Sequence, residues 1–151
     1  MACGSKSKSC CRKSCVRYYN ESTQPFAAGQ TLQLQLAGAR VVDSGIAIDV
    51  QPMSYTTLKT GLYHLVADVI IDVDTAGSGT IQFFMDNVPL PCTRRTIRLP
   101  AGDNEVHTET DLELTGCCCD VEHTFTLVLT SVDAVGSVIH LCSGIVKYSE
   151  V

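Results

Sequence analysis

In LYHLVADVIIDVD (residues 62–74), apolar side chains recur at every second position. In VHTETDLEL (residues 106–114), apolar and small residues alternate with one histidine and three acids. A period of two belongs to a β-strand whose two faces differ in exposure. Both stretches are therefore predicted to be strands, the second with a buried face and an acidic, solvated face. The buried face of the first strand is expected to carry Tyr63, Leu65, Ala67, Val69, Ile71 and Val73.

The same alternation continues on both sides of these strands. Gly, Pro and Asp separate the alternating segments, and no helical period of apolar residues intervenes. The chain is therefore predicted to be all-β. Pro89 and Pro91 confine their segment to a sheet edge or a bulge, because proline cannot donate to a strand ladder. The further predicted strands are TLQLQL (31–36), IAIDV (46–50), TIQFFMD (80–86), VEHTFTLVLTSV (121–132) and SVIHLCSGIVKYS (137–149).

The length suits one domain with an additional N-terminal segment. The 151 residues include no tryptophan and only 6% aromatic residues, so Val, Ile and Leu must fill the core, as is usual in sheets. Residues 1–24 are polar, rich in Ser, Lys and Cys, and lack periodicity, which predicts an arm outside the core. The globular domain is expected over residues 25–151.

The formal charge of −5 conceals an asymmetry along the chain. The first nineteen residues contain five cations and no acid, whereas the remainder contains 6 basic and 16 acidic residues, so arm and domain have opposite signs. A basic arm could contact phosphates, but an acidic protein surface suits it equally, and nucleic acid is not the expected partner. The cations are Lys6, Lys8, Arg12, Lys13 and Arg17.

The sequence shows neither the pattern of a secretory signal nor that of a membrane span. The first nineteen residues lack the apolar core that a secretory signal requires. Asp or His interrupts the apolar stretches well before the roughly 18 residues of a membrane span. Neither secretion nor a membrane span is expected.

The order of the segments resembles the tumour-necrosis-factor-like jelly roll, which also forms the globular heads of complement and collagen-like proteins. The resemblance covers roughly residues 25–151 and depends on FAAGQTLQLQL, SGIAIDV, LKTGLYHLVADVIIDV, FFMDNVPL, HTFTLVLTS and IVKYS. Gly61, Leu62 and Tyr63 match a family phrase that opens a central strand. An antiparallel jelly-roll sandwich with an extended N-terminal arm is what the resemblance implies.

The resemblance also implies an assembly. Members of this family form homotrimers through one apolar sheet face, and similar small jelly rolls decorate capsids or form head fibres on phages. A short basic arm could attach such a trimer to a capsid or another particle protein, which implies a virion protein made in the host cytoplasm. A bacterial spore-surface or cell-surface domain is the alternative. The implied threefold contact involves Tyr63, Val66, Ile70, Ile139, Leu141 and Ile145.

Nine cysteines raise the question of metal binding or cross-linking. A disulfide framework is not expected in a chain without a signal peptide. The arm contains Cys3, Cys10, Cys11 and Cys15, for which zinc ligation, anchoring between chains and plain reduced thiols remain open. Cys117, Cys118 and Cys119 are predicted to lie in a loop, where they could meet sister chains around a threefold axis, bind a shared ion or have no such role. No cofactor is expected, with zinc as the alternative.

No catalytic constellation is predicted. Serines, cysteines and histidines are present, but no local signature joins a nucleophile to a base. His64 and His107 are expected on solvated faces, whereas His123 and His140 are expected on more apolar ones. Cys92 and Cys142 are expected as small buried residues within strands. An enzyme is not expected, and a binding module for carbohydrate or protein at the trimer apex is the alternative to a structural role.

Overall fold

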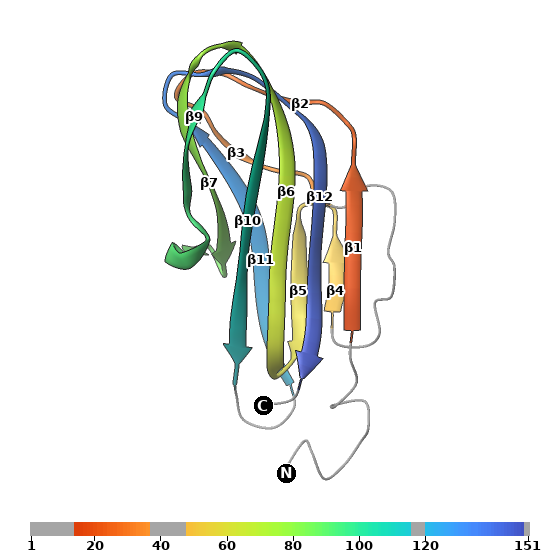
Figure 1. Cartoon of the computed structure of the whole chain (residues 1–151). Helices are drawn as coiled ribbons and strands as arrows, with labels where there is room; N and C mark the ends of the chain where they lie inside the picture. Colours follow the sequence, from red (N-terminus) through yellow and green to blue (C-terminus); the bar gives the residue numbers. More distant parts are fainter. Residues whose placement is uncertain (1–13, 37–47, 116–119, 150–151) are drawn as a thin grey trace.

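Two antiparallel β-sheets face each other in the computed structural model, which describes residues 14–36, 48–115 and 120–149 (Figure 1). Sheet A has the order β1-β12-β6-β10, with β2 also paired to β12. Its strands are β1 (Ser14–Asn20), β2 (Gln24–Phe26), β6 (Gly61–Thr75), β10 (Gly102–Leu114) and β12 (Val135–Ser149).

Sheet B has the order β4-β5-β11-β7-β8, with β3 also paired to β11 and β9 to β7. A short 3-10 helix, Pro91–Thr93, lies between β8 and β9, at the segment where the two prolines predicted an edge. The strands of sheet B are β3 (Thr31–Gln33), β4 (Ile48–Gln51), β5 (Ser54–Lys59), β7 (Gly77–Met85), β8 (Val88–Pro89), β9 (Arg95–Leu99) and β11 (Asp120–Ser131).

The core lies between the sheets and is built by the alternation read from the sequence. On β6, the six side chains from Tyr63 to Val73 that were predicted to face the core are at most 3% exposed. On β10, Val106 and Thr108 are buried while His107 and Glu109 are exposed. These two face predictions are confirmed. Sheet B contributes Ile81, Phe83, Phe125, Leu127 and Leu129 to the same core.

A bulge in β12 explains why its sequence is apolar on both sides. The pairing of β12 with β6 shifts between Val138 and His140, so one extra residue enters β12 at that point. Val138 points into the core, Ile139 and His140 are both only half-buried, and Leu141 points inward again. The strand therefore exchanges its inward and outward positions halfway along its length.

Gly61 allows β6 and β12 to approach closely at the start of β6. Its φ of +156° lies outside the range that other residues favour, and a Cβ there would stand 2.5 Å from Cε of Lys147. Lys147 is 1% exposed and lies opposite Tyr63 in the register of the two strands. The glycine of the Gly61-Leu62-Tyr63 phrase is thus needed to accommodate a buried lysine chain.

The boundary expected after residue 24 is wrong for residues 14–24. All seven residues of β1 pair with β12, from Ser14 opposite Lys147 to Asn20 opposite Leu141. Val16 and Asn20 are buried, and the Asn20 amide donates a hydrogen bond of 2.9 Å to the Gln35 carbonyl. This segment is ordered by backbone pairing, which a pattern of side chains does not reveal.

The remaining arm residues are not described by the structure. Ser14 is the first described residue, so the tail cations and thiols that precede it lie outside the described residues. They are Cys3, Lys6, Lys8, Cys10, Cys11, Arg12 and Lys13.

Candidate functional site

The outer face of sheet A is the face turned away from sheet B. It carries many of the described charged and titratable side chains. It consists of the residues that alternate with the buried ones on β6 and β10, together with the outward residues of β12 and β1. Every described strand belongs to one of the two sheets, so no described strand covers this face. Its members are Leu62, His64, Val66, Asp68, Ile70, Asp72, Asp103, Glu105, His107, Glu109, Asp111, Glu113, Ile139, His140, Cys142, Val146, Arg17 and Tyr19.

Three of the six predicted trimer-contact residues lie on this face. Val66, Ile70 and Ile139 are half-buried outward residues of β6 and β12, with Ile139 in the bulge beside Ile70 and the exposed Asp68 between Ile70 and Val66; these three residues are called the aliphatic zone. An apolar group at this level of exposure on a sheet face is suited to packing against another surface.

The other three predicted contact residues are wrong. Tyr63, Leu141 and Ile145 are each 0% exposed because they point into the core between the sheets. Tyr63 belongs to the inward set of β6, and the bulge turns Leu141 and Ile145 inward on β12. A sister chain cannot reach them without opening the sandwich.

His107 of β10 pairs with two carboxylates, Asp68 across on β6 and Glu109 on its own strand. Its Nδ1 lies 2.6 Å from Oδ1 of Asp68, and its Nε2 lies 2.5 Å from Oε2 of Glu109. Ionised carboxylates only accept hydrogen bonds, so both ring nitrogens must donate, which requires the protonated imidazolium. The hydrogen bond to Asp68, followed by that to Glu109, accordingly raises the pKa of His107 above its ordinary value.

Two further histidines share this face. His64 on β6 lies with its Nδ1 2.8 Å from Oδ1 of Asp111 on β10. His140 on β12 lies 3.6 Å from Glu21 and stacks obliquely near Tyr19, with ring centroids 6.5 Å apart. The sequence placed His140 on an apolar strand face, whereas the bulge brings it to the same outer face as His64 and His107.

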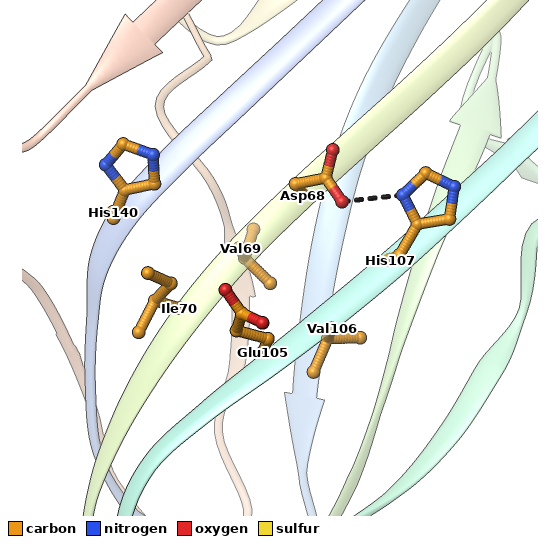
Figure 2. Close-up of a pocket in the computed structure, with 7 residues that line it drawn as sticks. All are labelled: Asp68, Val69, Ile70, Glu105, Val106, His107 and His140. Atoms are coloured by element: carbon orange, nitrogen blue, oxygen red, sulfur yellow. Dashed lines mark hydrogen bonds and ion pairs between the residues drawn. The ribbon is translucent and has the colours of Figure 1, made fainter.

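A shallow hollow of about 260 Å³ lies between β12, β6 and β10 on this face (Figure 2). Figure 2 shows Asp68 and Ile70 on β6, Glu105 and His107 on β10, and His140 on β12 around it. Val69 and Val106 complete the lining. The hollow thus joins an aliphatic floor to two carboxylates and two imidazoles.

The fourth histidine, His123, lies on sheet B and holds a hairpin turn in place. Its Nδ1 lies 2.6 Å from Oδ2 of Asp86, while Oδ1 of Asp86 accepts the Thr124 amide at 2.9 Å. Asp86 and Asn87 have positive φ, 51° and 65°, as a two-residue hairpin turn requires. Desolvation raises the pKa of Asp86, but the hydrogen bonds from His123 and Thr124 outweigh it and hold this pKa below its ordinary value.

The described thiols do not form a metal centre. Cys92 is exposed in the 3-10 helix with its Sγ 3.2 Å from the Thr110 hydroxyl, and Cys142 is half-buried on the outer face of sheet A. The prediction that both are buried within strands is therefore wrong for Cys92, and Cys142 lies in strand β12 but is only half-buried. Among the described residues, no three His, Cys, Asp or Glu side chains are grouped so as to hold a metal ion.

The predicted zinc and cross-linking positions cannot be placed. Cys117, Cys118 and Cys119 lie outside the described residues, and so do the tail cysteines up to Cys11. Cys15 is in β1, and Arg17 on the same strand is exposed. Zinc binding and cross-linking between chains stay predictions.

The chemistry of the described face is that of charge pairing and apolar contact. In the part of the chain that the structure describes, each histidine is paired with a carboxylate and none with a hydroxyl or a thiol. No helix within the described ranges has the length and apolar character needed to cross a membrane.

Comparison with solved structures identifies the architecture. Murine APRIL, in a crystal structure at pH 5.0, superimposes with a TM-score of 0.66 at 14% identity, over 91% of this chain and 100% of that chain. The fold is a tumour-necrosis-factor-like jelly roll. PRD1 vertex protein P5 superimposes with a TM-score of 0.53 at 14% identity, over 90% of this chain and 96% of that chain. Neither a protein-family model nor a curated protein sequence matches the chain.

Proposed function

We propose that this protein is a structural virion protein, a homotrimer that decorates a capsid or forms a head fibre. The observation that carries this proposal is the aliphatic zone of Val66, Ile70 and Ile139 on the outer face of sheet A. Aliphatic side chains at the centre of an outward sheet face are not stabilised by contact with water. A sister chain that packed on this face would bury them, and the burial of apolar surface would stabilise the assembly.

The size of the face supports a contact between copies. Four strands about 4.8 Å apart and roughly 13 residues long, at about 3.3 Å per residue, cover on the order of 800 Å². That area equals the roughly 800 Å² that each partner buries in an ordinary stable interface. The strands of sheet A provide this length on average, since β1 has 7 residues, β10 has 13, and β6 and β12 have 15 each.

Similarity of fold supports the virion part of the proposal. PRD1 vertex protein P5 has the same architecture over 96% of its own chain. The basic N-terminal residues, from Lys6 to Lys13, would attach the trimer to an acidic surface of the particle, since their charge is opposite to that of the rest of the chain. Arg17 is exposed at the adjoining β1 and extends this positive charge onto the domain.

Native mass spectrometry and sedimentation of the full chain test the assembly. A trimer at micromolar concentration is expected. A chain that remains monomeric under these conditions would overturn the proposal. Attachment is tested by removing residues 1–13 and measuring incorporation into the parent particle, which should be lost while the trimer persists.

A further inference from the structure

Asp68 places a carboxylate inside the aliphatic zone. On the outward face of β6 it stands between Val66 and Ile70, and its side chain is 57% exposed. A sister chain that covers the aliphatic zone therefore covers this carboxylate as well. Removing an ionised carboxylate from water is costly unless a counter-charge accompanies it. The contact proposed above thus needs a cation at Asp68.

His107 is the group that can supply this cation. It lies directly opposite Asp68 in the register of β6 and β10, with its Nδ1 2.6 Å from Oδ1 of Asp68 (Figure 2). Arg17 is the only arginine or lysine among the described outward residues of sheet A. It belongs to β1, which β12 separates from β6, and within the described residues no ion pair joins it to Asp68.

The second carboxylate at His107 makes this counter-charge depend on a proton. Oε2 of Glu109 lies 2.5 Å from Nε2, while Asp68 takes Nδ1. A protonated ring donates to both carboxylates, whereas a neutral ring has one donor and turns a lone pair toward the other carboxylate. The hydrogen bond to Asp68, then that to Glu109, raises the pKa of His107 although burial lowers it. Loss of the proton removes the positive charge and one hydrogen bond together.

Other titratable and charged groups surround this bridge. Glu105 precedes His107 by two residues on β10, and His140 borders the same hollow from β12. The negative charge of Glu105 favours the imidazolium, whereas a protonated His140 opposes it. Cys142 of β12 lies opposite the aspartate of the bridge. Along the other edge of β10, the 3-10 helix and β9 carry Cys92, Arg94, Arg95 and Arg98, and none of these three arginines forms an ion pair within the described residues.

We propose that contact between copies through the outer face of sheet A is proton-dependent, with His107 as the counter-ion that allows Asp68 to be buried. The proposal rests on the contact proposed above and adds its regulation. In the free chain the pair is exposed and water screens it. A sister chain excludes this water, so the charges attract each other more strongly and the ring holds its proton more firmly. Association therefore takes up protons, and the assembly tightens as pH falls.

Sedimentation of the full chain at constant ionic strength tests this regulation. The trimer dissociation constant of the wild type should rise about tenfold or more from about pH 6 to about pH 8, a range in which histidine titrates and ordinary carboxylates stay ionised. Asp68→Asn needs no counter-ion, so it should be tighter than the wild type at the higher pH and vary less than about threefold over the range. His107→Gln cannot become charged, so it should be weak at both ends of the range.

Controls separate this bridge from the other titratable groups. His64→Gln removes a second pair of the same face, but Asp111 in that pair is 68% exposed on the edge strand, so the pH dependence should persist. His123→Gln makes the same change on sheet B, and Cys142→Ser removes the thiol opposite Asp68. Both should also retain the pH dependence. Circular dichroism at each pH checks that every variant is folded.

The outcomes distinguish this regulation from the trimer itself. A wild-type trimer with the same dissociation constant across the range would overturn the proton dependence and leave the trimer in place. A dependence that survives Asp68→Asn unchanged would also overturn it, because another group would then carry the proton. A wild-type chain that is monomeric across the whole range would remove the proposed function, and this regulation with it.

Discussion

The outer faces of the two sheets differ although both belong to one sandwich. Sheet B presents threonines that hydrogen-bond across strands, such as Thr56 with Thr124 at 3.2 Å and Thr31 with Thr130 at 3.4 Å. Sheet B also presents half-buried Val128 and Phe84, whereas sheet A combines its aliphatic side chains with histidines and carboxylates. Hydroxyl ladders suit a face that remains in water, whereas the mixture on sheet A suits a face that meets a partner. The difference supports the proposal that assembly uses sheet A.

The largest expected effect comes from placing a charge on the outer face of sheet A. The same change on the outer face of sheet B is its control. Val66→Asp on sheet A should raise the trimer dissociation constant more than about 100-fold, because an unpaired charge buried at a contact costs about 3–5 kcal/mol. Val128→Asp on β11 is the matched control, since Val128 is also half-buried and lies on the outer face of sheet B. Sedimentation at a series of concentrations measures both constants. Equal weakening by the two variants would contradict the distinction between the faces.

A second prediction concerns the edge that β1 gives to sheet A. Removal of residues 1–24 should lower the free energy of unfolding by about 2 kcal/mol, because burial of Val16 is lost. Exposure of the β12 edge should also promote aggregation. Removal of residues 1–13 is the control and should leave the urea midpoint nearly unchanged. If the longer deletion melted like the shorter one, β1 would contribute nothing to stability.

A smaller effect is expected from the titration of His107 on sheet A. Its pKa is raised in the folded state, so its contribution to stability is complete below the ordinary value of 6.5 and is lost as pH rises through the folded pKa. His107→Asn and Asp68→Asn should both flatten this decline, each by less than about 1 kcal/mol since the pair is solvent-exposed. Urea unfolding on either side of pH 6.5 measures the decline, and an NMR titration of His107 should show a midpoint above 6.5. A midpoint below 6.5 would exclude the imidazolium bridge.

The smallest effect has the opposite pH dependence and belongs to sheet B. The pKa of Asp86 is lowered in the folded state, so its contribution is complete above the ordinary value of 3.8 and is lost as pH falls through the folded pKa. Asp86→Asn keeps a residue that tolerates positive φ and should remove that acid-dependent part, less than about 1 kcal/mol for an exposed pair. Acid unfolding followed by circular dichroism makes the comparison. Identical acid profiles for variant and wild type would show that the His123 pair does not stabilise the turn.

Only part of the candidate site could be predicted from the sequence. The outward positions of His64, His107, Glu109 and Asp111 follow from the alternation along β6 and β10. Their pairing across the two strands depends on register, which brings Asp111 opposite His64 and His107 opposite Asp68. Register is set by the whole sandwich, so the carboxylate and histidine pairs could not be read from either strand alone.

The sequence by itself determined the all-β class and the inward residues of β6 and β10, because a period of two reports directly which side chains face a core. The jelly-roll expectation came from the resemblance of its segments to a known family. Only the tertiary structure decided that β1 is a strand, that Leu141 and Ile145 point inward, and that His140 shares a face with His107. Backbone pairing and a one-residue bulge control these three features. Neither of them alters the local pattern of apolar residues, so neither is visible until the strands are placed side by side.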